Sequence, residues 1–268
     1  MRKVVGISQR VRLSWLDAVP MRIEKSTSGA ELRSFLNSHL SEELPGPESR
    51  AKTSGIIMRI WCAIPLDRIP LRDRALELLP RITSQERIFL HWGMAALAYP
   101  FFRDTAEVIG RLLALQDDFT TAQVQDRMLT SWGDRTTSSD AVQRLITTFV
   151  DWGILCSTKA RGHFVSSKKI STDNISLQLW LLEALLKASS SDEIEAQQLL
   201  RLPESYPFSI SVGVHDLRKD ENFTVHRQGL DMDMIALPAE NVAPSLKVSK
   251  SRKKDNVGEV MRRGLFND

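Results

Sequence analysis

Apolar and polar positions alternate with the period of an α-helix over the first hundred residues. Leucine and phenylalanine side chains recur every three or four positions after Ser28, a favourable N-cap residue. Thr83 is followed three residues later by Glu86, which is the spacing of a capping box. The pattern predicts four helices, over residues 28–44, 48–64, 71–79 and 83–99. We therefore expect a helical N-terminal domain over residues 1–103.

The segment "FTTAQV" carries two signals of a helix start, after an amphipathic helix predicted in "RDTAEVIGRLLALQ". Thr120 and Gln123 have capping-box spacing, and Phe119 and Val124 take the two positions of a hydrophobic staple. Gly133 is suited to end the helix, because glycine adopts the conformation of a helix C-terminus without strain. The segment therefore predicts a short, well-delimited helix.

A further helix is predicted from "TTSSDAVQRL" onward. Thr137 with Asp140 repeats the capping-box spacing, so Thr137 is the expected N-cap. The apolar stripe of this helix consists of Val142, Leu145, Ile146, Phe149 and Val150. Its opposite face carries Ser139, Asp140, Gln143, Arg144 and Thr147. Short polar side chains and one arginine are able to reach base edges or phosphates.

The stretch "ILCSTKARGHFVSS" then predicts a β-hairpin, with Gly162 available for the positive φ of its turn. The basic residues of its tip and flank are Lys159, Arg161, His163, Lys168 and Lys169. Three helices followed by a two-stranded wing is the order of a winged helix-turn-helix. We expect that unit over residues 104–170.

Two uses of such a unit stay open at this stage. In the first, helix 138–150 enters the major groove of double-stranded DNA. Its residues Ser139, Gln143, Arg144 and Thr147 then face bases or nearby phosphates, and the hairpin residues Lys159, Arg161, His163, Lys168 and Lys169 contact the flanking backbone. In the second, the unit binds another protein and never touches DNA. The basic hairpin favours DNA, whereas Asp134 and Asp140 would repel phosphates.

The chain after residue 170 divides into two further parts. Two helices are expected within 173–201, and alternation over 206–237 predicts a β-hairpin with a polar turn at "RKDEN". We assign residues 171–245 to this helical pair and small C-terminal hairpin. Residues 246–268 form a basic segment that we expect to be flexible. It is either a solvated tail without a partner or an arm that contacts phosphates or an acidic partner through Lys250, Arg252, Lys253 and Lys254.

Composition narrows the classes of function. The 268 residues carry a net charge of only +3, so affinity for nucleic acid must come from local basic clusters. Cys62 and Cys156 both stand in apolar surroundings, which predicts two buried, reduced thiols. No spacing of histidines and cysteines suits a metal, and no phosphate-cradling glycine loop or nucleophile motif occurs. We expect no enzymatic activity, cofactor, metal or small-molecule substrate.

Apolar runs are too short for a membrane protein. The longest, "IFLHWGMAALAYPFF" and "ISLQLWLLEALLKA", fall short of the ~20 residues that span a bilayer. The N-terminus lacks the continuous apolar run of a secretory signal. The sequence therefore predicts a cytoplasmic protein without membrane partners.

Four segments, spread over residues 30–155, resemble the BREX phage-defence accessory family (BrxA-like proteins). They are "AELRSFLNSHL", "SRAKTSGIIMRIW", "YPFF" before a helix, and "TTSSDAVQRLITTFVDWGIL". The resemblance implies a small, mostly helical, non-enzymatic DNA-binding adaptor within a multi-protein bacterial defence system. The alternatives are a protein-docking subunit of a larger complex and a winged-helix transcriptional regulator, which would need a symmetric dimer.

Overall fold

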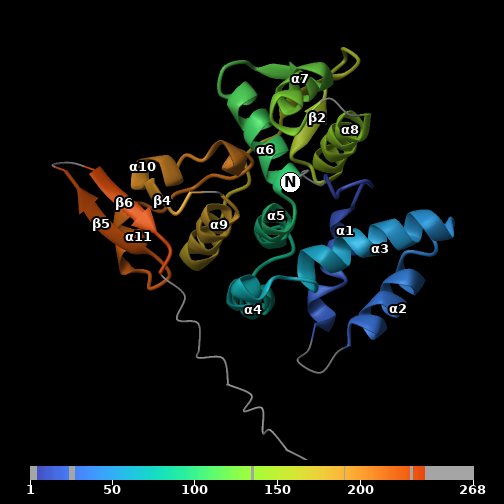
Figure 1. Ribbon diagram of the computed structural model, residues 1–268, viewed down its shortest axis with the longest axis horizontal. Coiled ribbons are helices and arrows are strands. Elements are labelled where there is room, and N and C mark those ends of the chain that lie inside the picture. Colours follow the sequence, from blue (N-terminus) through green and yellow to red (C-terminus); the bar gives the residue numbers. More distant parts are fainter. Residues whose placement is uncertain (1–4, 24–27, 134–135, 190, 230–231, 239–268) are drawn as a thin grey trace, which may run out of the picture. The chain divides into compact units, whose positions relative to one another are not determined.

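Helices make up most of the part of the chain that the computed structural model describes, residues 5–23, 28–133, 136–189, 191–229 and 232–238 (Figure 1). The helices are α1 (Leu13–Asp17), α2 (Gly29–His39), α3 (Pro47–Trp61), α4 (Ile69–Leu78), α5 (Arg87–Ala98), α6 (Pro100–Leu113), α7 (Thr121–Trp132), α8 (Thr136–Asp151), α9 (Ile175–Ala188), α10 (Ala196–Leu199) and α11 (Val214–Lys219). Short 3₁₀ turns are η1 (Pro20–Arg22), η2 (Leu66–Arg68), η3 (Leu79–Arg81) and η4 (Pro203–Ser205). The predicted mainly α-helical fold is confirmed.

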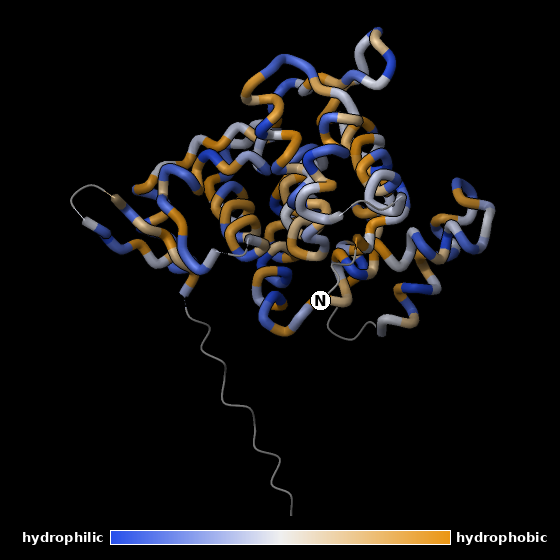
Figure 2. Tube along the Cα trace, turned by 45° about the horizontal axis from the view of Figure 1, so that its top comes forward, coloured by the Kyte–Doolittle hydropathy of each residue, from blue (hydrophilic) through white to orange (hydrophobic). Residues whose placement is uncertain are grey.

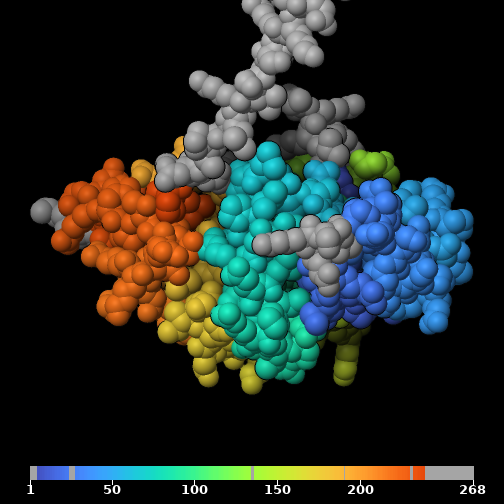
Figure 3. Space-filling view, turned by 90° about the horizontal axis from the view of Figure 1, so that it is seen from below, coloured from blue at the N-terminus to red at the C-terminus, as the bar shows by residue number. Residues whose placement is uncertain are grey.

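Helix α5 forms the middle of the packing (Figure 1). Every residue from Ile88 to Leu97 is buried, which is the signature of a helix surrounded by others. Its largest contact is with α9, and it also packs against α1, α3 and α6. Seen from below, α4 lies between the C-terminal elements and helices α2 and α3 (Figure 3). The N-terminal helices and α9 therefore enclose one hydrophobic core.

An aromatic cluster joins α5 to the elements that follow it. The ring of Trp92 lies 4.9 Å from that of Phe102 and 5.0 Å from that of Phe149. Phe102 and Phe149 are themselves 5.2 Å apart, edge to face. Because these rings come from α5, α6 and α8 and are fully buried, α8 is fixed against the core by one face. The described residues up to Pro238 form one compact unit. The predicted divisions at residues 103 and 170 stay predictions.

A three-stranded antiparallel sheet accompanies α6, α7 and α8. Its strands are β1 (Asp118–Thr120), β2 (Leu155–Ser157) and β3 (His163–Ser166), in the order β1-β3-β2. The predicted hairpin is β2–β3, with Gly162 at φ 79°. Strand β1 was not expected; it pairs Phe119 with Phe164, and both side chains are buried. The hairpin is thus tied back to the start of α7.

Three of the four predicted helix-capping residues form the expected hydrogen bonds. Ser28 with Glu31, and Thr120 with Gln123, form reciprocal capping boxes at the starts of α2 and α7. Thr83 and Glu86 exchange both bonds one turn ahead of α5. The fourth prediction was wrong, because α8 already begins at Thr136 and Thr137 lies inside its first turn. Gly133 ends α7 at φ 80°, as predicted.

Replacing Thr120 by alanine is expected to lower the free energy of unfolding by about 1 kcal/mol. The hydroxyl of Thr120 accepts a hydrogen bond from the Gln123 amide at 3.2 Å, which alanine would leave without that partner. Urea unfolding followed by circular dichroism measures the difference. Thr130→Ala, on the exposed side of the same helix, is the control and should change stability by less than about 0.5 kcal/mol. Equal effects of the two substitutions would contradict the capping role.

The C-terminal part departs from the prediction in two places. The second of the two helices expected within 173–201 is instead strand β4 (Glu193–Glu195) followed by the single turn of α10. The predicted turn at 218–222 was wrong, because 214–219 is helical and the hairpin is β5 (Thr224–Gln228) with β6 (Met232–Ala236). Strand β4 pairs with β6, giving a second antiparallel sheet of order β4-β6-β5. A small C-terminal β-hairpin exists, but it begins later than predicted, and the earlier strand β4 adds a third strand to it.

A buried histidine fastens α1 and α3 to α5. His91 is completely buried, its Nδ1 accepts a hydrogen bond from Trp61 Nε1 at 3.3 Å, and its Nε2 lies 2.9 Å from Asp17 Oδ1. An accepting Nδ1 requires the ring proton on Nε2, so that nitrogen donates to the aspartate. Both ring nitrogens are satisfied within the fold. His91 therefore links α1 and α3 to α5 through these two hydrogen bonds.

Candidate nucleic-acid interface

Helix α8 exposes a polar face, because its opposite, apolar face is buried in the hydrophobic core. Val142, Leu145, Ile146 and Phe149 are at most 1% exposed. Gln143 and Arg144 lie on the outer face and are exposed. Neither side chain forms a hydrogen bond or ion pair with any described residue. The two are therefore available to an external partner.

The other two predicted residues of α8 are less accessible. Ser139 is half-buried, and its backbone carbonyl accepts a hydrogen bond from Gln125 Nε2 at 3.1 Å, which ties α8 to α7. Thr147 is half-buried and donates its hydroxyl proton to the Gln143 carbonyl at 2.9 Å. The Thr147 oxygen remains an acceptor only. The outer face of α8 therefore depends chiefly on Gln143 and Arg144.

The hairpin tip carries two exposed cations. Lys159 and Arg161 stand in the loop 158–162, where the Ala160 amide donates to Thr158 Oγ1 at 3.1 Å and Gly162 supplies the positive φ. Figure 2 shows this loop projecting from the helices with mostly hydrophilic positions. Among the described residues, neither cation has an acidic partner. Their charge is consequently uncompensated.

His163 has an internal role. Its Nδ1 lies 2.8 Å from Asp118 Oδ2, so the ring bridges β3 to β1. This contact is partly exposed, with 38% of the histidine side chain and 50% of the aspartate side chain accessible, and is worth little stability on its own. His163 positions the hairpin and is not a free cation.

Lys168 and Lys169 do not join the tip. They follow β3, whereas Lys159 and Arg161 precede it, and the four residues of β3 span roughly 13 Å. Both lysines are exposed. Strand β2 follows α8 after a turn at Gly153, and α8 packs against β2, so the hairpin and α8 are neighbours. The predicted residues thus fall into three separate places: α8, the hairpin tip and the end of β3.

Acidic residues interrupt the basic character of this region. Asp140 is exposed on α8 one turn before Arg144 and makes no ion pair with it. Asp134 lies outside the described residues, as do Lys250, Arg252, Lys253 and Lys254. The local charge of the described interface therefore rests on Arg144, Lys159 and Arg161.

The cysteines differ from each other. Burial raises the pKa of the half-buried Cys62 thiol to about 11, so it stays protonated at neutral pH. The predicted burial of Cys156 was wrong, because its side chain projects from β2 and is exposed, 3.1 Å from Ser167 Oγ. Within the ranges that the structure describes, no group of three histidine, cysteine or acidic residues is arranged to hold a metal ion.

We compared the chain with known protein families, proteins and structures. No protein-family model, curated protein or solved structure matches the chain. The likeness to BREX accessory proteins therefore stays a prediction. Across the described residues, no helix combines the length and the apolar character needed to cross a bilayer.

Proposed function

We propose that the chain binds double-stranded DNA without enzymatic activity, using α6, β1, α7, α8 and the β2–β3 hairpin as a winged helix-turn-helix. Element order and the strand order β1-β3-β2 support this assignment. The observation that carries it is the outer face of α8. Gln143 and Arg144 are exposed there without partners among the described residues, beside a hairpin whose two tip cations are also uncompensated.

The dimensions of α8 suit a duplex. Its 16 residues extend about 24 Å, and a helix fits the major groove, which is about 12 Å wide. Arg144 would contact a guanine edge or a phosphate, and Gln143 an adenine edge. Lys159 and Arg161 would contact the flanking phosphates. Because most of these groups suit phosphates, we propose contact mainly through the DNA backbone, within a multi-protein cytoplasmic assembly.

The double substitution Arg144→Ala with Arg161→Ala is expected to weaken duplex binding at least about tenfold at 0.1 M salt. Both arginines are exposed, so the fold should survive. Fluorescence anisotropy of a labelled 20-base-pair duplex measures the affinity. A matched control removes two exposed cations elsewhere, through Arg81→Ala with Lys219→Ala. Equal losses in both double variants would contradict DNA contact through α8 and the hairpin, and no binding by the natural chain would instead favour the protein-docking alternative.

A further inference from the structure

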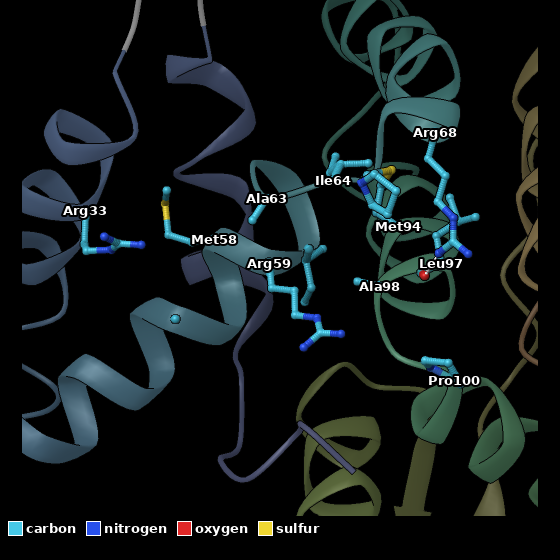
Figure 4. Close-up of a pocket in the computed structure, with 13 residues that line it drawn as sticks. Arg33, Met58, Arg59, Ala63, Ile64, Arg68, Met94, Leu97, Ala98 and Pro100 are labelled. Atoms are coloured by element: carbon cyan, nitrogen blue, oxygen red, sulfur yellow. Dashed lines mark hydrogen bonds between the residues drawn. The ribbon is translucent and has the colours of Figure 1, made fainter. Parts of the chain in front are cut away.

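A cavity of about 540 Å³ opens between α2, α3 and α5 (Figure 4). Its apolar wall includes Met58, Ile60, Ile64, Met94 and Leu97. Three arginines complete the lining, namely Arg33 from α2, Arg59 from α3 and Arg68 from η2. Among the described residues, no aspartate or glutamate lines it. An apolar wall with a few convergent polar groups is the usual makeup of a small-molecule site.

The three arginines are incompletely satisfied. Arg33 is exposed and makes no hydrogen bond or ion pair with a described residue. The guanidinium of Arg59 lies 5.1 Å from the centre of the Tyr99 ring, a contact that orients it without neutralising its charge. In Figure 4, Arg59 extends from α3 into the space in front of α5.

Arg68 is the third arginine of the cavity lining. Its Nη1 donates to the Leu97 carbonyl at the end of α5, which fixes the side chain at the cavity wall. Its Nε is buried and donates no hydrogen bond, since the nearest carboxylate oxygen, that of Asp67, is 3.8 Å away. A buried donor without an acceptor costs roughly 1–3 kcal/mol.

We propose that this cavity binds a small amphipathic oxyanion. Its carboxylate or phosphate head would lie against Arg59, because a guanidinium group matches either head bidentately. Its apolar body would lie on Met58, Met94 and Leu97. The volume is in the range of pockets that hold one small molecule. The site stands apart from α8 and the hairpin, so its test is independent of DNA binding.

Titration calorimetry of the full chain with octanoate, octyl phosphate, 1-octanol and inorganic phosphate tests the proposal. Octanoate or octyl phosphate should bind at least about tenfold more tightly than 1-octanol, which lacks the charge, and than inorganic phosphate, which lacks the apolar body. The tighter of the two octyl anions identifies the preferred head. If 1-octanol binds as tightly as both octyl anions, or no octyl compound binds, the proposal is overturned.

Substitutions locate the site. Arg59→Gln should weaken binding of the octyl anion at least about tenfold and leave 1-octanol unchanged. Arg81→Gln, an exposed arginine outside the cavity, should change neither. Gly55 lies on the cavity lining with no atom near the position of a Cβ, so Gly55→Leu should fold and block all octyl compounds. Octyl-anion binding that survives both Arg59→Gln and Gly55→Leu would overturn the assignment.

Discussion

Replacing Gly110 by alanine should destabilise the chain by about 3 kcal/mol or more. Gly110 lies on α6, where the 3₁₀ turn η4 crosses it. A Cβ at this position would stand 1.9 Å from the Pro203 carbonyl oxygen and 2.6 Å from its carbonyl carbon. Backbone atoms cannot rotate aside as a side chain does, so α6 and η4 must separate, and such overpacking is costly.

Urea unfolding gives the free energy for this substitution. Gly55→Ala is the matched control, because Gly55 is also inside a helix but has no atom near its Cβ position. There alanine should stabilise the chain by about 0.5–1 kcal/mol, through its higher helix propensity. A loss of less than about 1 kcal/mol for Gly110→Ala would show that α6 and η4 are not in close contact.

Replacing Glu204 by glutamine should remove a pH dependence of stability. Glu204 is only 5% exposed, and burial, with a smaller contribution from the Glu107 carboxylate, raises its pKa from 4.5 to about 7. Below pH 4.5 the carboxyl is protonated in both folded and unfolded chains. Between pH 4.5 and 7 the unfolded chain releases its proton first, so stability falls as pH rises. Above about pH 7 the loss is complete, on the order of 3 kcal/mol.

The variant should therefore be more stable than the natural chain at pH 8 and equal to it near pH 4. Its backbone carbonyl still accepts the hydrogen bond from Trp92 Nε1, which keeps the local packing. Denaturant unfolding at several pH values gives the difference in free energy of unfolding between the variant and the natural chain. Groups that titrate alike in both proteins do not contribute to this difference. Glu221→Gln, at an exposed position, should show no such difference. A difference between Glu204→Gln and the natural chain that does not change with pH would contradict the ionisation account.

Local chemistry explains which elements were predictable from the sequence. Helices α2 and α7 begin where the side chains of Ser28 and Thr120 accept hydrogen bonds from backbone amides three residues later. Both starts were therefore predictable from the local sequence. The hairpin β2–β3 was equally local, since Gly162 lies at its turn. Such features need no knowledge of the rest of the fold.

Distant contacts explain the failures. The segment 193–195 has no strong strand signal, and it becomes β4 by pairing with β6, about forty residues later. The start of α11 depends on Gly213, whose amide donates to Asp216 at 2.8 Å in place of continuing a strand. Strand β1 likewise exists through its partner β3. Tertiary pairing overrides the local alternation in each case.

The candidate site residues also differ in whether local sequence or distant contacts determine their positions. Gln143 and Arg144 were predictable because the buried stripe of α8 dictates its outer face. The bridge from His163 to Asp118 was missed, since it depends on the unexpected strand β1. Arg33, Arg59 and Arg68 come from three separate elements, and only the packing of α2 on α3 and of α3 on α5 brings them to one cavity.

The salt dependence of duplex binding tests the central claim most directly. The logarithm of the association constant is measured against the logarithm of salt concentration, for the natural chain and for the variant lacking Arg144 and Arg161. Binding to phosphates predicts a negative slope for the natural chain and a slope shallower by about 2 for the double variant. Slopes that are equal in the two proteins, or the absence of duplex binding at 0.1 M salt, would contradict DNA contact through α8 and the hairpin.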